Sequence, residues 1–358
     1  MEKFKVVVLV ACVLWSGARP HARQAEGFRA AAARLLQRVR LPPARLHHAP
    51  RVQRDVEVAL QRHWPGCRVI PFGSILTGLA LEQSDVDLML QLPNSTGLAP
   101  AEVLARIGDS ILEHTQLFHG LRRVPQARVP IVSTVHVPTG FNVDISYDNY
   151  NGIINTNLAR YLLNLDERAM QLSIIVKHWA RLHGITGRHR LPSYGMYLMV
   201  IFYLQQKQIL PPVVQLQKNA EINLVAGWNM GFSHEKYETR NKESLCTLLG
   251  GFFKYYTEFD FNKYVISPFA GRPLAVALFE HVNFVPEEFV NYKKNVAWNV
   301  TRPLSTRQAC IQDPFNHSRN LASHVEIHRN SSFVTHFQYA TMKFRQKCDG
   351  FLETILAA

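Results

Sequence analysis

The sequence predicts an α+β fold in which a strand-containing first half precedes a mostly helical second half. Strand-like runs occur before residue 150, and long runs with helical spacing of apolar residues dominate after it. The composition is 47% hydrophobic and 19% charged over 358 residues, which is typical of a globular protein with room for two domains. We therefore expect a mixed β-sheet flanked by helices, followed by a helical domain.

The expected elements rest on spacing and on terminators. Apolar residues in 26–39 recur at helical spacing until Pro42 and Pro43, and those in 54–64 do so until Pro65. Residues 141–146 alternate with period two, which indicates a strand. In order, we expect helices at 26–39 and 54–64, a strand at 68–72, a helix or turn at 75–81, a strand at 86–92, a helix at 101–115, strands at 128–136 and 141–146, and helices at 157–165, 168–183, 193–206, 244–259 and 336–356.

The first residues resemble a targeting sequence. Lys3 and Lys5 precede an apolar run at 6–15 and small residues at 16–18, which resembles a secretory signal peptide. The arginine-rich continuation would also suit a mitochondrial presequence, and a third interpretation is an N-terminus without any address. We expect residues 1–25 to be a targeting or disordered segment, and we discount the secretory interpretation.

Charge and cysteine usage narrow the class of protein further. The net charge of +13 favours a polyanionic partner, either nucleic acid or an anionic membrane surface. The five cysteines are odd in number, widely separated and without C-x-x-C spacing. This pattern predicts neither a disulfide framework nor a structural zinc site, and it favours a reducing compartment.

The stretch at 72–90 carries the strongest chemical signal. Gly73 and Ser74 form a small-residue turn after a predicted strand, and Asp85 and Asp87 flank Val86 at the start of the next strand. Side chains two apart in a strand point the same way, so the two carboxylates would lie side by side and repel each other. Mg²⁺ bound with a nucleoside triphosphate would relieve this repulsion, because Mg²⁺ takes one or two carboxylates plus phosphate oxygens.

A third carboxylate completes the predicted metal site. Asp144 lies in the alternating string FNVDIS, on a polar face opposite Val143 and Ile145, in a strand that we expect to begin a new sheet edge. Three carboxylates on neighbouring strands predict a two-metal site for phosphoryl or nucleotidyl transfer.

The chain resembles the DNA polymerase β-type nucleotidyltransferase superfamily in its G-S turn, its S-D-V-D-L string and its N-V-D-I string. The second half narrows the resemblance to terminal uridylyltransferases and small poly(A) RNA polymerases through the strings NGIINTNLARYL, IIVKHWARLHGI, LPSYGMYLMVIFYLQ, LLGGFFKYY and CIQDPFNHSRN. The resemblance covers residues 72–325. It implies a helical N-terminal segment at 26–53, a nucleotidyltransferase catalytic domain at 54–150 and a PAP-associated helical domain at 151–358.

The resemblance also implies roles for individual residues. It makes the three aspartates catalytic ligands of Mg²⁺, or of Mn²⁺, with Asp144 also helping to take the proton from the RNA 3′ hydroxyl. It predicts that Gly73 and Ser74 contact triphosphate oxygens and that Asn149 and Thr156 contact the nucleotide sugar. It also predicts that Lys177 and Arg181 bind the β and γ phosphates, and that Ser193 and Tyr194 bind the γ phosphate and the base. Lys177 and Arg181 are four residues apart, so they share one helix face and can converge on one triphosphate.

One position departs from the family pattern. After Asp313, Pro314 and Phe315, Arg319 stands where the uridylyltransferases have a histidine that favours uracil. A guanidinium donates hydrogen bonds and cannot accept them, so it can bind uracil carbonyls but cannot accept from the amino group of adenine. We therefore favour UTP over ATP. His317 is an alternative to Arg319, but as an exposed loop histidine it is expected to be incidental.

The sequence thus predicts a template-independent enzyme that adds UMP from UTP to RNA 3′ ends, with a poly(A) polymerase using ATP as the alternative. A catalytically silent RNA-binding relative is the alternative outside enzymes. We expect an RNA 3′ end as substrate and allow for an RNA-binding protein partner, with no stable membrane association. The expected compartment is the cytoplasm, with the nucleus and the mitochondrion as alternatives.

Overall fold

The computed structural model describes residues 19–93, 97–127, 129–187, 189–306, 309–325, 327, 331–344 and 348–357, with side chains from residue 26 onward. The targeting segment predicted at residues 1–25 therefore lies outside the described residues, apart from the helical backbone of 19–25. None of the helices in the described part of the chain combines the length and apolar character that a membrane span requires.

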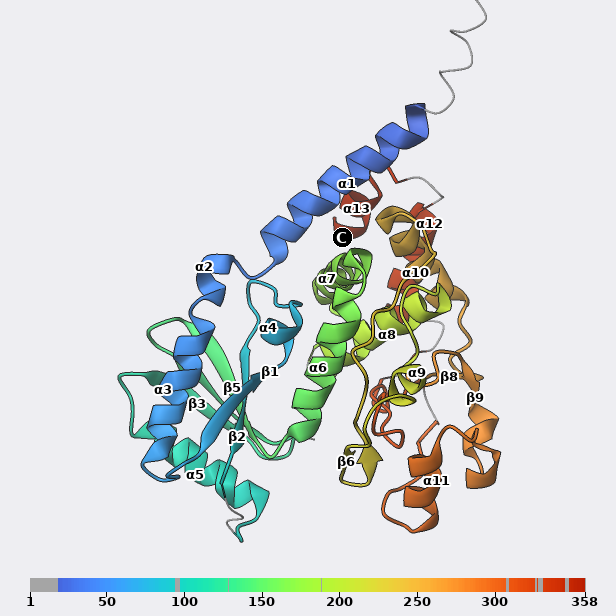
Figure 1. Cartoon of the computed structure of the whole chain (residues 1–358). Helices are drawn as coiled ribbons and strands as arrows, with labels where there is room; N and C mark the ends of the chain where they lie inside the picture. Colours follow the sequence, from blue (N-terminus) through green and yellow to red (C-terminus); the bar gives the residue numbers. More distant parts are fainter. Residues whose placement is uncertain are drawn as a thin grey trace, which may run out of the picture. The chain divides into compact units, whose positions relative to one another are not determined.

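The chain folds into two compact units. The sheet unit is Val39–Met170, and the helical unit combines Met1–Arg38 with Gln171–Ala358. The boundaries fall at the end of α1 (Arg19–Val39) and within α7 (Glu167–Leu182). The sheet unit contains α2 (Pro43–Leu46), α3 (Ala49–Gln61), β1 (Arg68–Phe72), α4 (Ser74–Thr77), β2 (Val86–Gln91), α5 (Pro100–Leu112), β3 (Phe118–Val124), β4 (Ile131–His136), β5 (Phe141–Tyr147) and α6 (Tyr150–Asn164) (Figure 1).

The sheet unit is built on five strands in the order β1-β2-β5-β4-β3. β2 and β5 run parallel, and the other neighbours are antiparallel. The expectation that the strand of Asp144 begins a new sheet edge is wrong, because β5 lies between β2 and β4. The two edges are β1 and β3, and β3 is a strand that the sequence did not predict. Gly120 and a register irregularity between His119 and Arg122 interrupt the alternation that would have revealed it.

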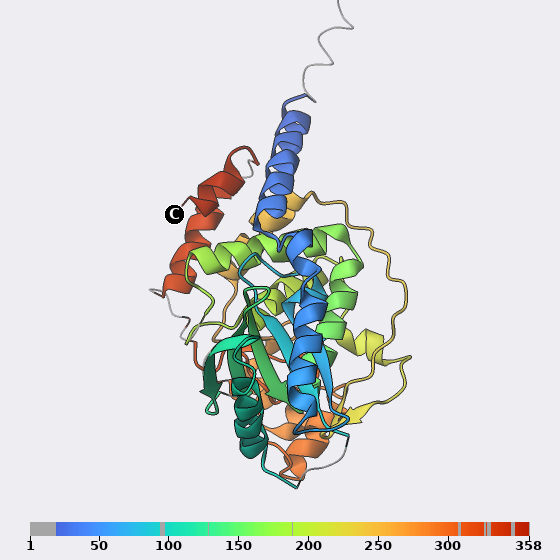
Figure 2. The same cartoon turned by 90° about the vertical axis from the view of Figure 1, so that its left-hand side faces the viewer.

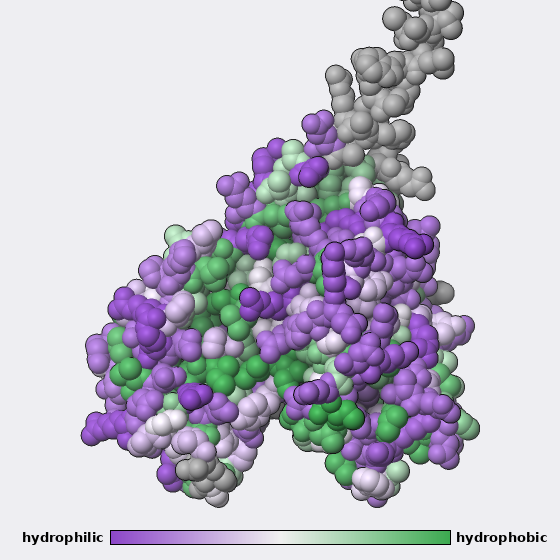
Figure 3. All heavy atoms as spheres, viewed as in Figure 1, coloured by the Kyte–Doolittle hydropathy of each residue, from purple (hydrophilic) through white to green (hydrophobic). Residues whose placement is uncertain are grey.

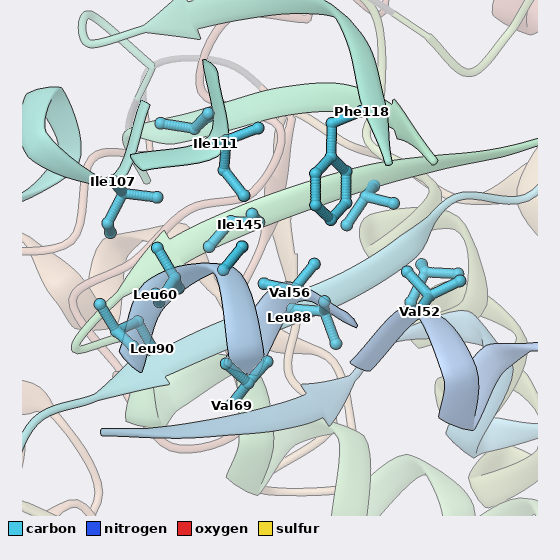
Figure 4. Packing of buried hydrophobic residues seen from close by; sticks show 14 of the residues in the cluster. Val52, Val56, Leu60, Val69, Leu88, Leu90, Ile107, Ile111, Phe118 and Ile145 are labelled. Atoms are coloured by element: carbon cyan, nitrogen blue, oxygen red, sulfur yellow. The ribbon is translucent and has the colours of Figure 1, made fainter. Parts of the chain in front are cut away.

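Two helices cover one face of this sheet. Figure 2 shows α3 and α5 side by side in front of the strands. Their apolar side chains meet alternate residues of the central strands, so that Leu88 and Ile145 are fully buried against them (Figure 4). Residues on a strand alternate between faces, so Asp87 and Asp144 point away from this core. The core includes Val52, Val56, Leu60, Val69, Leu88, Leu90, Ile107, Ile111, Phe118 and Ile145.

Side chains of α3 satisfy the outer edge of β1. The amide of Gln53 donates to the carbonyl of Val69 at 2.8 Å, and the N–H of Val69 donates to the carboxylate of Glu57 at 2.8 Å. Pro71, the next residue on the same side, has no N–H to leave unpaired. The edge strand is therefore fixed against α3, and this holds the turn that follows Phe72.

Several element boundaries differ from the sequence predictions. The helix predicted at 54–64 begins at Ala49, because Pro50 is tolerated in a first helical turn, where its missing N–H is not needed. The last helix, predicted at 336–356, is two helices, with Gly350 in the left-handed region (φ 63°) before the second. The strand at 68–72 and the helix at 193–206 are confirmed at both ends.

The helical unit is organised around α8 (Ser193–Gln206), whose residues are nearly all buried. The remaining elements are α9 (Val213–Gln217), β6 (Leu224–Val225), β7 (Trp228–Asn229), α10 (Leu245–Glu258), β8 (Tyr264–Ile266), β9 (Leu274–Ala275), the 3₁₀ helices η1 (Val276–Phe279) and η2 (Val282–Phe284), α11 (Val290–Ala297), β10 (Cys310–Ile311), α12 (Ser332–Phe344) and α13 (Phe351–Leu356). Trp179 on α7, Phe253 on α10 and Phe337 on α12 pack edge to face on one another, with ring centroids 4.6–5.5 Å apart.

A disulfide joins Cys246 at the start of α10 to Cys348, which precedes α13. The prediction of no disulfide is therefore wrong. The two cysteines are 102 residues apart in the sequence and belong to no spaced motif, so only the packing of α10 against the C-terminal helices brings them together. Cys67 and Cys310 are buried free thiols.

Candidate active site

Two of the predicted carboxylates are direct neighbours in the sheet. Asp87 on β2 and Asp144 on β5 are register partners in the parallel pair, and both are half-buried. Asp85 stands one residue before β2, on the same side as Asp87 because side chains alternate. The alternation predicted for β5 is confirmed, since Val143 and Ile145 are fully buried.

The electrostatics of Asp144 reflect this crowding. Burial raises the pKa of Asp144, and the negative charge of Asp85 raises it as well. The hydroxyl of Ser133, its register partner on β4, donates to the carboxylate and lowers the pKa, as does the positive charge of Arg122 on β3. The net direction is upward, so the ionised form of Asp144 is costly unless a cation lies beside it.

The donor chemistry of these residues fits a hard divalent cation. Carboxylate oxygens are the protein ligands that Mg²⁺ prefers, and two of them stand on adjacent strands at the same register. Among the described residues, no three His, Cys, Asp or Glu side chains already have the spacing of a complete metal site. The ligand roles of Asp85, Asp87 and Asp144 stay a prediction.

The Gly73–Ser74 turn lies directly beside Asp87. Gly73 has φ 79°, a left-handed conformation that favours glycine, and a Cβ at this position would collide with the Asp87 carboxylate. The N–H of Gly73 donates to Thr156 Oγ1 at 2.9 Å, so this group is already committed within the protein. Phosphate binding by Gly73 and Ser74 stays a prediction, and the N–H of Gly73 already has a partner in this structure.

The two predicted sugar-binding residues sit at the start of α6. Asn149 is its N-cap, and its side-chain oxygen accepts from the N–H of Gly152 at 3.2 Å. Thr156 donates to the carbonyl of Gly152 at 2.7 Å while it accepts from Gly73. Thr156 therefore connects α6 to the Gly73 turn, whereas Asn149 caps the helix, and sugar binding by the two residues stays a prediction.

A pocket of about 400 Å³ opens beside Asp87 within the sheet unit. Its walls are largely apolar, and Figure 3 shows hydrophobic surface over this part of the unit, around β1. Its volume falls in the range of small-molecule sites. The lining residues are Leu46, His47, Ala49, Pro50, Gln53, Pro71, Phe72, Ile75, Leu76, Val86, Asp87 and Arg160.

The other predicted nucleotide-binding residues belong to the helical unit. Lys177 and Arg181 lie on α7 and flank His178, which is half-buried. Burial lowers the pKa of His178, and the positive charges of Arg38 and Arg181 lower it further. The histidine is thus kept neutral in a cationic neighbourhood, which suits an anionic ligand.

Tyr194 and Arg319, far apart in the sequence, are brought together by Asp313. The hydroxyl of Tyr194 donates to Asp313 Oδ2 at 3.2 Å, and Arg319 Nη1 lies 3.5 Å from the same oxygen. The guanidinium carbon is 5.8 Å from the centre of the Tyr194 ring. The ring itself is half-buried. Ser193 is exposed at the start of α8.

Asp313 is the residue of this group that the sequence prediction missed as a site residue. It is 2% exposed, and its Oδ1 accepts from the N–H groups of Phe315 and Asn316 at 3.1 and 3.0 Å. The signal was available, since an acidic residue within an apolar stretch and an arginine six residues later can pair across a turn.

His317 was expected to be exposed, and this expectation is wrong. It is 5% exposed, and its ring packs against Phe269 and Phe289 at 4.1 and 4.9 Å. Burial lowers the pKa of His317 to about 3, so it is neutral at any physiological pH. A core histidine of this kind cannot substitute for Arg319 at a ligand.

Comparison with known proteins identifies related families over two segments. Residues 29–164 match the family described as the central palm domain of mitochondrial-like poly(A) RNA polymerase, and residues 244–319 match the Cid1 family of poly(A) polymerases. These segments contain most of the residues considered above, including all three aspartates and Arg319.

Individual relatives carry the same two kinds of name. A speckle targeted PIP5K1A-regulated poly(A) polymerase of Xenopus tropicalis is 24% identical over 344 residues, which cover 76% of this chain and 39% of the relative. Human terminal uridylyltransferase 7 is 30% identical over 293 residues, which cover 76% of this chain and 18% of that protein. The chain thus spans well under half the length of these curated relatives.

The fold agrees with a solved structure. The crystal structure of mtPAP in complex with ATPγS superposes with a TM-score of 0.77 at 21% identity, covering 93% of this chain and 73% of that one. At this identity the likeness establishes the fold.

Proposed function

Because the chain belongs to the nucleotidyltransferase superfamily, among the terminal uridylyltransferases and small poly(A) polymerases, we propose that it adds UMP from UTP to RNA 3′ ends without a template. The observation that carries the proposal is the register pairing of Asp87 with Asp144, with Asp85 close enough to raise the pKa of Asp144. A carboxylate cluster of this kind beside a glycine turn suits metal-assisted transfer to a triphosphate-bound phosphorus.

The reaction breaks one bond and forms another at the α phosphate. The RNA 3′ hydroxyl oxygen attacks this phosphorus, its proton leaves towards Asp144, and pyrophosphate departs. Asp85, Asp87 and Asp144 would hold Mg²⁺ or Mn²⁺, which lowers the pKa of the hydroxyl and neutralises the triphosphate. The protein must then position the nucleotide, since positioning and charge stabilisation supply most of the catalysis in this chemistry.

The remaining residues take the binding roles. Ser74, beside Gly73, would contact triphosphate oxygens, and Asn149 and Thr156 would border the sugar. On the helical unit, Lys177 and Arg181 would hold the β and γ phosphates, Ser193 would add a hydroxyl to the γ phosphate, and Tyr194 would stack on the base. The positive net charge of +13 would attract the RNA substrate.

Arg319 supports UTP as the substrate. Its guanidinium can donate to a uracil carbonyl and cannot accept from an adenine amino group. ATP is the second candidate, because relatives such as the Xenopus protein are named poly(A) polymerases.

The test is extension of a labelled oligoribonucleotide by the purified chain, supplied with one nucleoside triphosphate at a time and Mg²⁺. We expect the longest products with UTP, and equal or better extension with ATP would overturn the choice of base. A chain that binds RNA but extends it with none of the four nucleotides would be a silent RNA-binding relative instead.

We propose the cytoplasm as the compartment, and an RNA-binding protein as an additional partner for target choice. The Cys246–Cys348 disulfide is an observation that opposes this compartment, because disulfides are rare in the reducing cytoplasm. Imaging of a C-terminally tagged chain, together with thiol counting on protein from the same cells, tests this. Entry into the secretory pathway would contradict the proposal.

A further inference from the structure

Three polar side chains meet in one part of the helical unit. We call Tyr194, Asp313 and Arg319 the base corner. Both oxygens of its one carboxylate already have partners within the protein. Asp313 Oδ2 accepts from Tyr194 and faces Arg319, and Oδ1 accepts from two backbone N–H groups. At 2% exposure, the carboxylate is also out of reach of a ligand.

Tyr194 reinforces this arrangement. Its hydroxyl hydrogen is directed at Asp313, and the pKa of Tyr194 is raised well above its usual value, chiefly by burial and then by the charge of Asp313. The phenol therefore stays protonated and supplies no anionic acceptor. Its ring remains half-buried and borders the guanidinium.

Arg319 has donors in excess of its partners. Its side chain is 21% exposed and its contact to Asp313 is long at 3.5 Å. Its Nε lacks a hydrogen-bond partner in the described structure but is buried, so only the exposed part of the guanidinium can meet a ligand. A guanidinium has five N–H donors and no acceptor. The neighbouring acceptors that lack partners, Asn316 Oδ1 and Ser318 Oγ, are buried within the loop and not at its surface.

The four bases differ in the group that such a corner would meet. Uracil and guanine carry a keto oxygen, O4 or O6, where cytosine and adenine carry an amino group, N4 or N6. A keto oxygen accepts from a guanidinium, whereas an amino group brings donor against donor and leaves both unsatisfied.

We propose that the base corner selects keto bases over amino bases, so that UTP is preferred to CTP and GTP is preferred to ATP. The proposal rests on the proposed function, since it takes the base of the incoming nucleotide to meet Arg319. It goes beyond UTP in making GTP a substrate of the same site. UTP is compared with CTP, and GTP with ATP, so that the two bases in each pair have the same ring size. A difference in affinity within a pair then reports on the keto or amino group.

The first experiment measures binding without chemistry. Each nucleoside triphosphate competes against radiolabelled UTP for the full chain in Mg²⁺, with no RNA present. We expect UTP to exceed CTP and GTP to exceed ATP in affinity by at least about fivefold, the lower end of discrimination by one base-edge contact. Equal affinities within both pairs would overturn the proposal.

A second experiment tests the residue. Arg319→Lys keeps a donor-only cation and should keep the order within both pairs, whereas Arg319→Gln can donate and accept and should reduce each ratio to below about twofold. Arg272→Gln is the matched control, because Arg272 forms an arginine–carboxylate pair with Glu288 at 2.6 Å outside the corner. Thermal unfolding of each variant checks folding, and Arg319→Lys retains the charge beside Asp313.

The outcomes separate this inference from the proposed function. Extension of RNA with all four nucleotides at similar rates would agree with the proposed transferase activity and would contradict the proposed preference for keto bases. Keto-selective binding without any extension would support the corner and contradict the transferase. An Arg319→Gln variant with the wild-type order would show that another residue makes the choice.

Discussion

The carboxylates of the sheet unit and the base corner of the helical unit are held by different kinds of structure. Asp87 and Asp144 are placed by the register of two parallel strands, so regular backbone hydrogen bonds fix their separation. Tyr194, at a helix start, is joined to a loop more than a hundred residues later by its side-chain contact with Asp313. Within that loop, Asp313 and Arg319 are paired by their side chains and by a backbone hydrogen bond from the Asp313 N–H to the Arg319 carbonyl at 3.0 Å.

This difference separates the chemistry from the choice of substrate. A metal-binding carboxylate pair needs nothing but correct register, so a short motif in the sequence is enough to specify it. A site that discriminates bases needs its donors oriented and its acceptors occupied, which depends on groups distant in sequence. The two regions should therefore fail in different ways when altered.

The largest effect is expected from removing the carboxylates. Asp85→Ala with Asp87→Ala should lower RNA extension by about a thousandfold or more, because metal-assisted charge stabilisation amounts to several kcal/mol. Nucleotide competition binding should retain the keto-over-amino order, since the base corner lies in the other unit. Extension at the wild-type rate would refute the catalytic assignment, and a lost keto-over-amino order would break the separation of the two regions.

A smaller effect is expected at the glycine turn. Gly73→Ala would force the turn away from Asp87, and a displacement of about 1 Å near reacting groups lowers rates by about a hundredfold. Gly140→Ala is the matched control, because Gly140 has a similar φ of 67° but an added Cβ would meet nothing within 4 Å. Rate loss in both variants to the same extent would attribute the effect to backbone strain alone.

The triphosphate contacts should alter binding more than the chemical step. Lys177→Ala and Arg181→Ala should each raise the KM for UTP by about tenfold to a hundredfold, the loss of one charge-assisted hydrogen bond. Steady-state extension kinetics measure this, with Lys254→Ala as the control, because Lys254 forms only an exposed pair with Glu258. An unchanged KM in both variants would remove these residues from the nucleotide site.

The smallest effect concerns stability and pH. Because the pKa of Asp144 is raised in the folded state, its protonated form stabilises the protein at low pH and this contribution is lost as pH rises through the folded pKa. Asp144→Asn should therefore raise the Tm at pH 7 in EDTA, on the order of 2 °C. The gain should vanish at a pH below the usual carboxyl range.

Added Mg²⁺ provides the complementary measurement. Divalent cation should raise the Tm of the wild type and have less effect on Asp144→Asn, because one ligand is then neutral. Equal stabilisation of both proteins by Mg²⁺ would remove Asp144 from the proposed ligand set.

Local patterns predicted much of the sheet unit, including the edge strand β1, but missed the opposite edge strand β3. The strand of Asp85 and Asp87 and the alternation around Asp144 follow from period-two spacing, which is a property of the strand itself. The central position of β5 and the existence of β3 were missed, because strand order depends on pairing partners, and Gly120 with its bulge hides the strand's alternation.

In the helical unit, the sequence predictions were wrong about the burial of a histidine and about a disulfide. His317 was expected at the surface and lies among Phe269 and Phe289, and Cys246 pairs with Cys348 across 102 residues. A loop in the sequence looks the same whether it is solvated or packed, so neither result could be inferred from neighbouring residues.

The sequence by itself determined the family, the two-part organisation and the identity of the candidate catalytic residues, because these depend on residue type and short spacing. Tertiary structure decided which groups face one another. It set Asp144 opposite Asp87, committed the Gly73 N–H to Thr156, and closed Asp313 onto Tyr194 and Arg319. Hydrogen-bond capacity is shared only between groups that meet in space, so the donors left for a ligand could be counted only after folding.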